Sequence, residues 1–129
     1  MSPFNEERTI LASAARIATP TCPGMANTRH RGMILVVNVT AQAVATTLTP
    51  ALQLLDPVSG EAVTIWTAAA AVNTADATIA YLFYPSPLAD AACLYTEAVD
   101  MVVPTKWRAV ITHSDANSIT YSVAAMLIL

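Results

Sequence analysis

The amino-acid sequence predicts a single all-β domain, either an antiparallel β-sandwich or a partly closed barrel, of about seven strands. Three observations support this fold class. Apolar residues alternate with polar or small ones along several segments, which is typical of half-buried strands. Other segments, such as MILVVNVT and TIAYLFY, are rich in β-branched and aromatic residues. Gly, Pro, Asp and Asn separate these segments, and a chain of 129 residues fits one domain.

The N-terminal part of the chain is expected to form an arm, a strand and a loop. Residues 1–8 are polar and contain a Pro, which predicts an arm before a sandwich domain at residues 9–129. Residues 9–17 suit either a short helix, because Ala, Leu and Arg favour one, or a first strand. We prefer the strand because the rest of the chain has strand patterns. Residues 18–32 contain two Pro and two Gly and predict a loop.

The next two strands are expected at residues 33–40 and 46–55. The first is an almost continuous β-branched run, which is typical of a strand that is covered on both faces. The second contains Pro50, which has no N–H to donate to a sheet ladder. This strand is therefore expected at a sheet edge or with a bulge at that point.

A tight turn and a return strand follow. Residues 56–60, with the sequence DPVSG, combine an Asx residue, a Pro that fixes φ and a closing Gly. Residues 62–67 then predict a strand in which Val63 and Ile65 face opposite to Trp66. We expect Trp66 to be a core residue.

The C-terminal half of the chain continues the strand pattern. Residues 78–84 predict a strand that a Pro-Ser-Pro sequence ends, and residues 88–103 predict an irregular stretch. Segment 106–129 alternates apolar with polar or small residues on both sides of the polar turn at 113–118. It predicts a half-buried antiparallel hairpin, with Trp107 pointing into the core.

The composition indicates a subunit of an assembly. Hydrophobic residues make up 55% of the chain and charged residues 12%, which is about half the usual charged share. A surface with so few charges exposes apolar or small side chains, and exposed apolar patches usually mark interfaces. The six basic residues are dispersed and the net charge is −3, which argues against nucleic acid as a partner. The uncharged runs fall short of the roughly 18 apolar residues that span a bilayer, so no membrane partner is expected.

The chemistry of an active site is missing from the sequence, so we expect no enzyme and name no catalytic, cofactor-binding or metal-binding residue. Residues 113–115 (His-Ser-Asp) are adjacent, whereas a catalytic triad converges from separate elements, so they predict a turn. Glu97 and Asp100 share a predicted loop and are expected to be solvated. Cys22 and Cys93 are expected to be free thiols. The three glycines have no phosphate-loop spacing.

Four stretches together resemble a known protein family. They are RGMILVVNVT at 31–40, LQLLDPVSG at 52–60, VPTKWR at 103–108, and THS at 112–114 with ITYSV at 119–123. The chain resembles, over roughly residues 9–129, small structural proteins encoded among the virion genes of tailed bacteriophages. The resemblance implies a virion part, often a capsid decoration (cement) protein. It also implies the major capsid protein as partner, a homo-oligomer, and a place on the capsid surface after synthesis in the host cytoplasm.

Three segments are expected at the interfaces of such a protein. The N-terminal arm would add to a neighbouring sheet as an extra strand, and a basic loop and the long irregular stretch would contribute contacts. The expected interface residues are Pro3, Phe4, Arg8, Arg29, His30, Arg31, Leu94 and Tyr95. Two alternatives stay open: a head–tail connector or tail-associated subunit, and a carbohydrate-binding β-sandwich module with Trp66 or Tyr84 on a solvent face.

Overall fold

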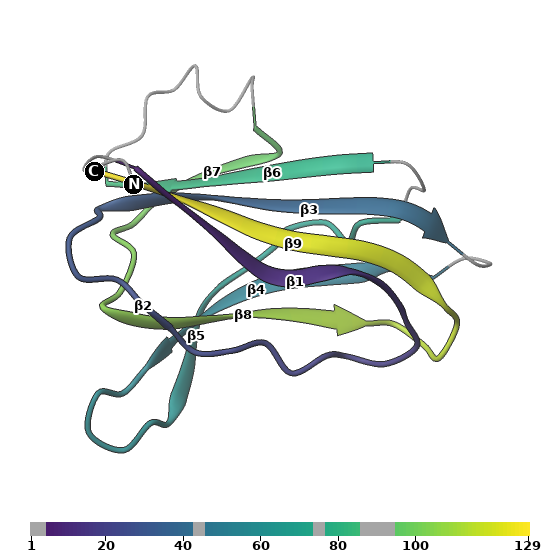
Figure 1. Ribbon diagram of the computed structural model, residues 1–129, viewed down its shortest axis with the longest axis horizontal. Coiled ribbons are helices and arrows are strands. Elements are labelled where there is room, and N and C mark those ends of the chain that lie inside the picture. Colours follow the sequence, from purple (N-terminus) through teal and green to yellow (C-terminus); the bar gives the residue numbers. More distant parts are fainter. Residues whose placement is uncertain (1–4, 43–45, 74–76, 86–94) are drawn as a thin grey trace.

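The structure is a computed structural model that describes residues 5–42, 46–73, 77–85 and 95–129. Within these residues the chain forms nine strands and no helix, which confirms the predicted all-β class. Two sheets pack face to face as a sandwich and do not close into a barrel (Figure 1). The strands are β1 (Glu6–Arg16), β2 (Met25–Ala26), β3 (Gly32–Gln42), β4 (Leu48–Leu55), β5 (Ala62–Thr67), β6 (Ala77–Tyr84), β7 (Glu97–Asp100), β8 (Lys106–His113) and β9 (Ile119–Ile128).

The five-stranded sheet has the order β1-β9-β3-β6-β7, and the four-stranded sheet has the order β2-β8-β4-β5. All strand pairs are antiparallel except β6 with β7, which is parallel. The two strands that the sequence did not predict are β2, inside the expected loop, and β7, inside the expected irregular stretch. They have two and four residues, which is too short for a periodic pattern to identify them.

The core lies between the inner faces of the two sheets. Along β9 every second residue is buried, as the alternation predicts. Residues 33–39 of β3 alternate between buried and half-buried, so within one copy this strand is fully covered on one face only and not on both as predicted. Trp107 is fully buried, and Trp66 packs its ring edge-on against Tyr81 and Phe83, with centroid distances of 5.0 and 4.8 Å. Edge-to-face contacts of this kind add to the free energy gained from burial. Both tryptophans are therefore core residues, as expected.

The predicted hairpin at 106–129 is wrong in its pairing. The two halves form β8 and β9, but these strands belong to different sheets: β8 pairs with β4, whereas β9 pairs with β1 and β3. The turn crosses from one layer to the other (Figure 1). Alternation shows which face of a strand is buried, but it does not identify the neighbouring strand. Both halves bury one face in the same core, so an arch between the layers satisfies the pattern as well as a hairpin does.

Pro50 lies in an interior strand, so the expected edge position is wrong. β4 pairs with β8 on one side and with β5 on the other. The carbonyl of Pro50 accepts a hydrogen bond from the Ala68 N–H at 2.8 Å, just beyond the end of β5. Because the backbone N and O of a residue point to the same side of an antiparallel strand, the missing N–H of Pro50 falls where this ladder ends.

The predicted turn and return strand at 56–67 are confirmed, but Val63 does not face opposite to Trp66 as predicted. A bulge separates the pairs Leu52–Trp66 and Gln53–Thr64, two residues after Pro50. Trp66 is buried while Val63 is exposed, but Val63 pairs with Leu54, so the bulge puts Val63 and Trp66 on one face of the ladder.

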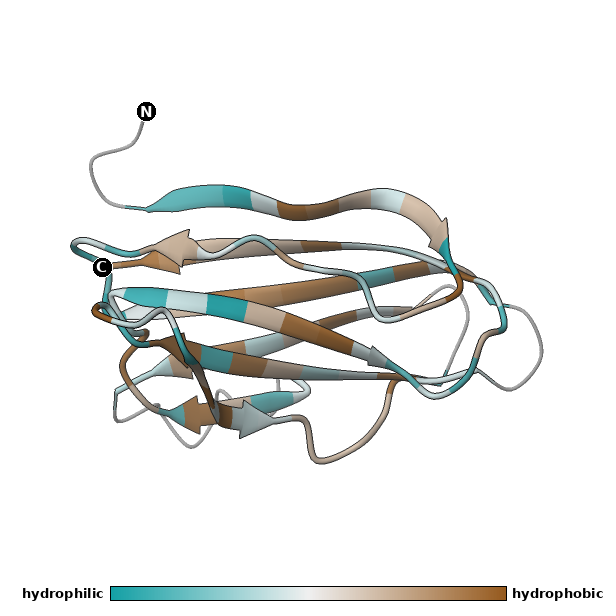
Figure 2. Ribbon diagram, turned by 90° about the horizontal axis from the view of Figure 1, so that it is seen from below, coloured by the Kyte–Doolittle hydropathy of each residue, from teal (hydrophilic) through white to brown (hydrophobic). Residues whose placement is uncertain are grey.

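The first strand begins earlier than predicted. β1 starts at Glu6, and residues 6–8 pair with residues 125–127 of β9, so the expected arm at 1–8 is wrong over its last three residues. The preference for a strand rather than a helix at 9–17 is confirmed. β1 begins with hydrophilic residues and becomes more hydrophobic further along (Figure 2).

Candidate interaction surface

The expected interface residues that the structure describes differ in accessibility. Arg8, Arg29 and Arg31 are exposed, Tyr95 is half-buried and His30 is buried. Pro3, Phe4 and Leu94 lie outside the described residues.

His30 is held inside by the buried side chain of Asn27. The Asn27 Nδ2 donates hydrogen bonds to the carbonyl oxygens of His30 at 2.7 Å and Val103 at 3.1 Å, and its Oδ1 accepts one from the His30 N–H at 2.9 Å. These bonds fix the loop between β2 and β3 against the segment before β8. The basic tripeptide therefore presents two arginines and conceals its histidine.

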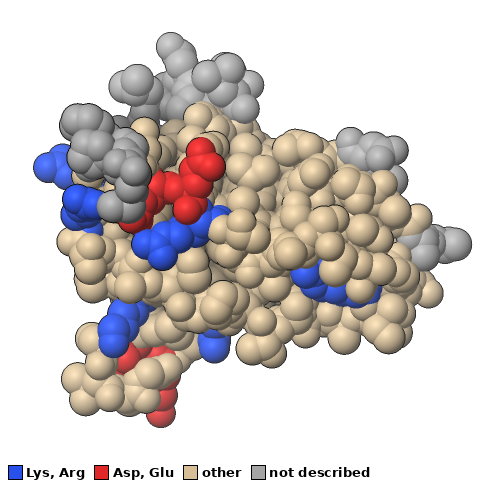
Figure 3. Space-filling model, in the orientation of Figure 1, with Lys and Arg blue, Asp and Glu red and all other residues tan. Residues whose placement is uncertain are grey.

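The structure brings part of the predicted arm and the basic loop together. Arg8 donates a hydrogen bond to Glu6 at 2.9 Å, and this bond holds the pKa of the Glu6 carboxyl below its usual value. The charges of Arg8, His30 and Arg29 lower the pKa of Glu6 further. The loop lies near the start of β1, since Glu6 pairs with Leu127 and the Arg31 N–H donates to the carbonyl of the next residue, Ile128, at 3.0 Å. On the face shown in Figure 3, charged side chains gather over the end that carries the chain termini.

The outer face of the five-stranded sheet is apolar in its centre. The alternate residues that point away from the core are half-buried aliphatic side chains, with Met126 more exposed at 39%. From the strand register, the apolar residues of this outer face are Ile34, Val36, Ala80, Leu82, Ala98, Ala124, Met126 and Ile128, and the polar Asn38, Thr78 and Ser122 continue the face toward one end. The central strands β3, β6 and β9 contain no charged residue.

Small residues make the outer face hollow. One pocket of about 450 Å³ lies over Ala124, between Thr9 of β1 and Val36 of β3. A second, of about 310 Å³, adjoins Ile34 and Met126. The solvent face of an antiparallel sheet is normally polar, so a hollowed face with an apolar centre, bordered by Glu7 and Arg8 of β1, indicates a surface suited to a partner. The sequence signal was the continuous β-branched run at 33–40, which predicted a strand covered on both faces.

A second exposed apolar region lies on the hairpin of β4 and β5. The Asp56 carboxylate fixes the turn by accepting hydrogen bonds from the Val58 N–H at 3.0 Å and the Ser59 hydroxyl at 2.7 Å. These bonds lower the pKa of Asp56, the Ser59 hydroxyl having the largest effect. Gly60 adopts φ 79°, which favours glycine. The turn therefore holds Val58 in the solvent, where its side chain is 94% exposed.

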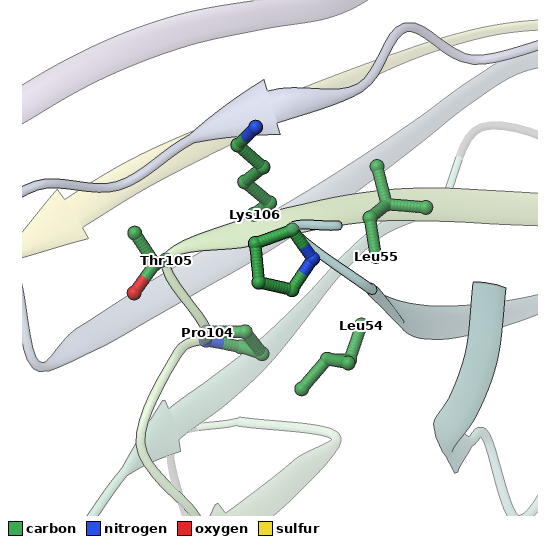
Figure 4. Close-up of a pocket in the computed structure, with 6 residues that line it drawn as sticks. Leu54, Leu55, Pro104, Thr105 and Lys106 are labelled. Carbon is green, nitrogen blue, oxygen red and sulfur yellow. The ribbon is translucent and has the colours of Figure 1, made fainter. Parts of the chain in front are cut away.

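Beside this hairpin lies an apolar pocket of about 290 Å³. Its lining consists of Leu54, Leu55, Pro57, Pro104, Thr105 and Lys106. Figure 4 shows the side chains of Leu54 and Pro104 close to each other, while Lys106 points its ammonium nitrogen away from both. The pocket can accept an aliphatic side chain and offers a positive charge at its rim.

The predicted turn at 113–118 begins one residue later, because His113 ends β8 and Ser114 and Asp115 open the connection to β9. The Asp115 carboxylate accepts hydrogen bonds from the Asn117 N–H and from the Thr46 hydroxyl, each at 2.9 Å. The Ser114 hydroxyl accepts one from the Thr47 N–H at 3.0 Å. The polar side chains therefore bind separate partners and do not converge on one point.

His113 belongs to a polar cluster with Tyr121 and Arg16. Its Nε2 lies 2.8 Å from the Tyr121 hydroxyl, and the Arg16 guanidinium lies 4.8 Å from the centre of the Tyr121 ring. Burial lowers the pKa of His113, and the charge of Arg16 lowers it further. Burial raises the pKa of Tyr121 to about 12. Arg16 also donates to the Tyr121 carbonyl at 2.7 Å, so the cluster ties β1 to β9.

Glu97 and Asp100 do not form a carboxylate pair. By register Glu97 shares a face with Tyr81 and Asp100 shares the opposite face with Tyr84. The Glu97 carboxylate accepts hydrogen bonds from the Trp66 indole N–H at 3.2 Å and from a backbone N–H at 2.8 Å. Burial, with a contribution from the Glu97 charge, raises the pKa of Tyr81 to about 12. Glu97 thus links β7 to β5 across the edge of the sandwich.

Cys22 is a free and buried thiol, as expected, and burial raises its pKa. Cys93 lies outside the described residues. Among residues 5–42, 46–73, 77–85 and 95–129, no group of three or more His, Cys, Asp or Glu side chains is placed to hold a metal ion. The same residues include no helix long and apolar enough to cross a membrane.

Comparisons with known proteins give no relative. Neither a protein-family model, nor a curated protein, nor a solved structure matches the chain.

Proposed function

We propose that the protein is a structural component of a phage virion, most specifically a capsid decoration protein. In this role it binds the outer shell, with the major capsid protein as its partner, and stabilises contacts between capsomers. Several copies of the chain act together as a homo-oligomer. The proposal assigns the protein no catalytic role.

The observation that carries this proposal is the outer face of the five-stranded sheet. A sandwich that stood alone in solvent would gain nothing from a row of Ile34, Met126 and Leu82 on its outer side. Covering such side chains contributes about 25 cal/mol per Å² of apolar surface removed from water. The four stretches that resemble small virion proteins add support, and this resemblance is the reason for proposing a phage particle as the assembly.

Cryo-electron microscopy of the virion that carries the protein is the direct test. Density for the sandwich on the outer shell at capsomer junctions would support the decoration role. Density at the neck or tail would replace it with the connector or tail-associated alternative. If the particle contains no copy of the chain, the proposal is wrong.

A binding experiment tests the surface. Purified protein is added to shells that lack it, and bound copies are counted after sedimentation. Met126→Lys places a charge on the outer face, in the row of Ile34 and Leu82, and is expected to weaken binding at least tenfold. Thr112→Lys introduces the same charge at an exposed position on the other sheet and serves as the matched control. Equal binding by the two variants would exclude the outer face as the docking surface.

The carbohydrate-binding alternative has little support in the described residues. Trp66 lies in the core cluster, and its indole N–H is bound by Glu97. Tyr84 is half-buried, and its hydroxyl donates to the Leu129 carbonyl at 3.0 Å. Neither ring is free to stack on a sugar, so we do not propose this function.

A further inference from the structure

The hairpin of β4 and β5 carries both halves of a self-complementary contact. One half is the turn itself, where Val58 is 94% exposed. The other half is the adjacent apolar pocket, lined by Leu54, Pro57 and Pro104 among others. The exposed side chain of Val58 lies beside an open apolar pocket on the same hairpin. Two identical copies could therefore each insert this side chain into the pocket of the other.

We infer that two copies of the chain associate through this hairpin, each inserting Val58 into the pocket of the other. Pro57 lines the pocket and directly precedes Val58, so protrusion and pocket lie side by side. In a contact with two-fold symmetry each surface meets itself, and this proximity lets both insertions form together. The pocket volume of about 290 Å³ is ample for one valine side chain.

The charges around the two halves are complementary. Lys106 is exposed at the rim of the pocket, and the hairpin turn is followed by the exposed Glu61. Among the described residues the one ion pair joins Arg8 and Glu6, so the ammonium of Lys106 has no carboxylate partner there within one copy. The Asp56 carboxylate is occupied by the turn, which leaves Glu61 to meet the partner's ammonium. The same complementarity selects a second copy over a partner with a basic surface.

The contact is small, which determines its strength. Stable interfaces bury about 1,200 Å² or more in total, and smaller ones are weak or transient. We therefore expect a dimer that dissociates in the micromolar range in solution. This inference rests on the proposed function in one respect: copies held close together on a shell have a high effective concentration, and a weak contact between them then becomes significant.

Sedimentation velocity of the full chain over roughly 1 µM to 1 mM tests the inference without any shell. The expected result is a reversible dimer. Val58→Asp is expected to weaken it by about tenfold or more, because a buried aliphatic side chain is replaced by a charge. Ile17→Asp is the matched control, because Ile17 is also an exposed apolar residue, at 63%. It lies after β1, far along the sandwich from the hairpin, and is expected to leave the dimer unchanged.

A charge exchange tests the ion pair. Lys106→Glu and Glu61→Lys are each expected to weaken the dimer, and the double variant is expected to restore it. A wild-type protein that stays monomeric throughout, a dimer that Val58→Asp does not affect, or a double variant that fails to recover would overturn the inference. Shell binding by Val58→Asp is measured separately. A monomeric variant that still binds shells would leave the decoration role intact, whereas a dimer that never binds shells would contradict only that role.

Discussion

Gly32 marks a close approach of two strands, and substituting it tests the packing of the five-stranded sheet. A Cβ at this position would lie 2.6 Å from the carbonyl oxygen of Phe83 and would overlap the ring of Tyr84. The carbonyl belongs to the ladder between β3 and β6, where Met33 pairs with Phe83, so it cannot move without loosening the sheet. The Tyr84 ring can turn away only by giving up its hydrogen bond to Leu129.

The expected cost of Gly32→Ala follows from these two contacts. Overpacking costs about 1–3 kcal/mol, and loss of a hydrogen bond costs about 0.5–1.5 kcal/mol. The alanine reduces the entropy of the unfolded chain, which offsets about 0.4–1 kcal/mol. The free energy of unfolding should therefore fall by about 2 kcal/mol, within a range of about 0.5–4 kcal/mol, as measured by urea denaturation followed through tryptophan fluorescence.

The other two glycines are internal controls for this measurement. A Cβ at Gly24 would lie 3.1 Å from the Leu55 Cδ1, the end of a flexible side chain, so Gly24→Ala should cost under about 1 kcal/mol. A Cβ at Gly60 would meet nothing within 4 Å, but φ is +79°, so Gly60→Ala should cost about 1–2 kcal/mol from backbone strain alone. If Gly32→Ala lowers stability no more than Gly24→Ala does, the close approach at Gly32 is refuted.

Three further predictions follow from single side chains. Glu97→Ala should lower the free energy of unfolding by about 1–3 kcal/mol, because a buried indole N–H and a backbone N–H lose their acceptor; an unchanged urea midpoint would contradict this. The pKa of His113 is lower in the folded than in the unfolded state, so stability should fall as the pH drops below about 6.5; in His113→Gln the urea midpoint should lose this part of its pH dependence. Cys22 should react slowly with a thiol reagent at neutral pH until the protein unfolds, since burial raises its pKa; rapid labelling of the peptide that contains Cys22 in native protein would show that the thiol is accessible.

The sequence predicts which face of each strand is buried better than it predicts which strands pair with each other. Trp107, Ile111 and Tyr121 are buried as the alternation indicates, because period two alone determines which side chains share a face. The layer crossing between β8 and β9 was missed because a polar turn of this length can close a hairpin or an arch. The interior position of Pro50 was missed because its missing N–H falls at the end of the β5 ladder, a detail of register that no local pattern contains.

The interaction surface was only partly predictable for the same reason. The continuous β-branched run at 33–40 indicated a strand covered on both faces, but the sequence analysis placed the expected interface elsewhere and named no residue of this outer face. The contributions of Ala124 and Met126 depend on β9 being the neighbour of β3, which the hairpin interpretation did not provide. The burial of His30 depends on Asn27 and Val103, which are distant from each other in sequence, so composition alone suggested an exposed basic cluster.

The place of β9 in the five-stranded sheet has a consequence for how the chain folds. β9 lies between β1 and β3, and its pairing with β1 joins residues near opposite ends of the sequence, such as Glu6 with Leu127. Topologies dominated by such long-range pairs fold slowly, typically in milliseconds to seconds. During synthesis β1 and β3 leave the ribosome long before β9, the strand that lies between them. Until β9 is made, the backbone edges of β1 and β3 that pair with it have no partner. The five-stranded sheet can therefore be completed only after β9 has left the ribosome.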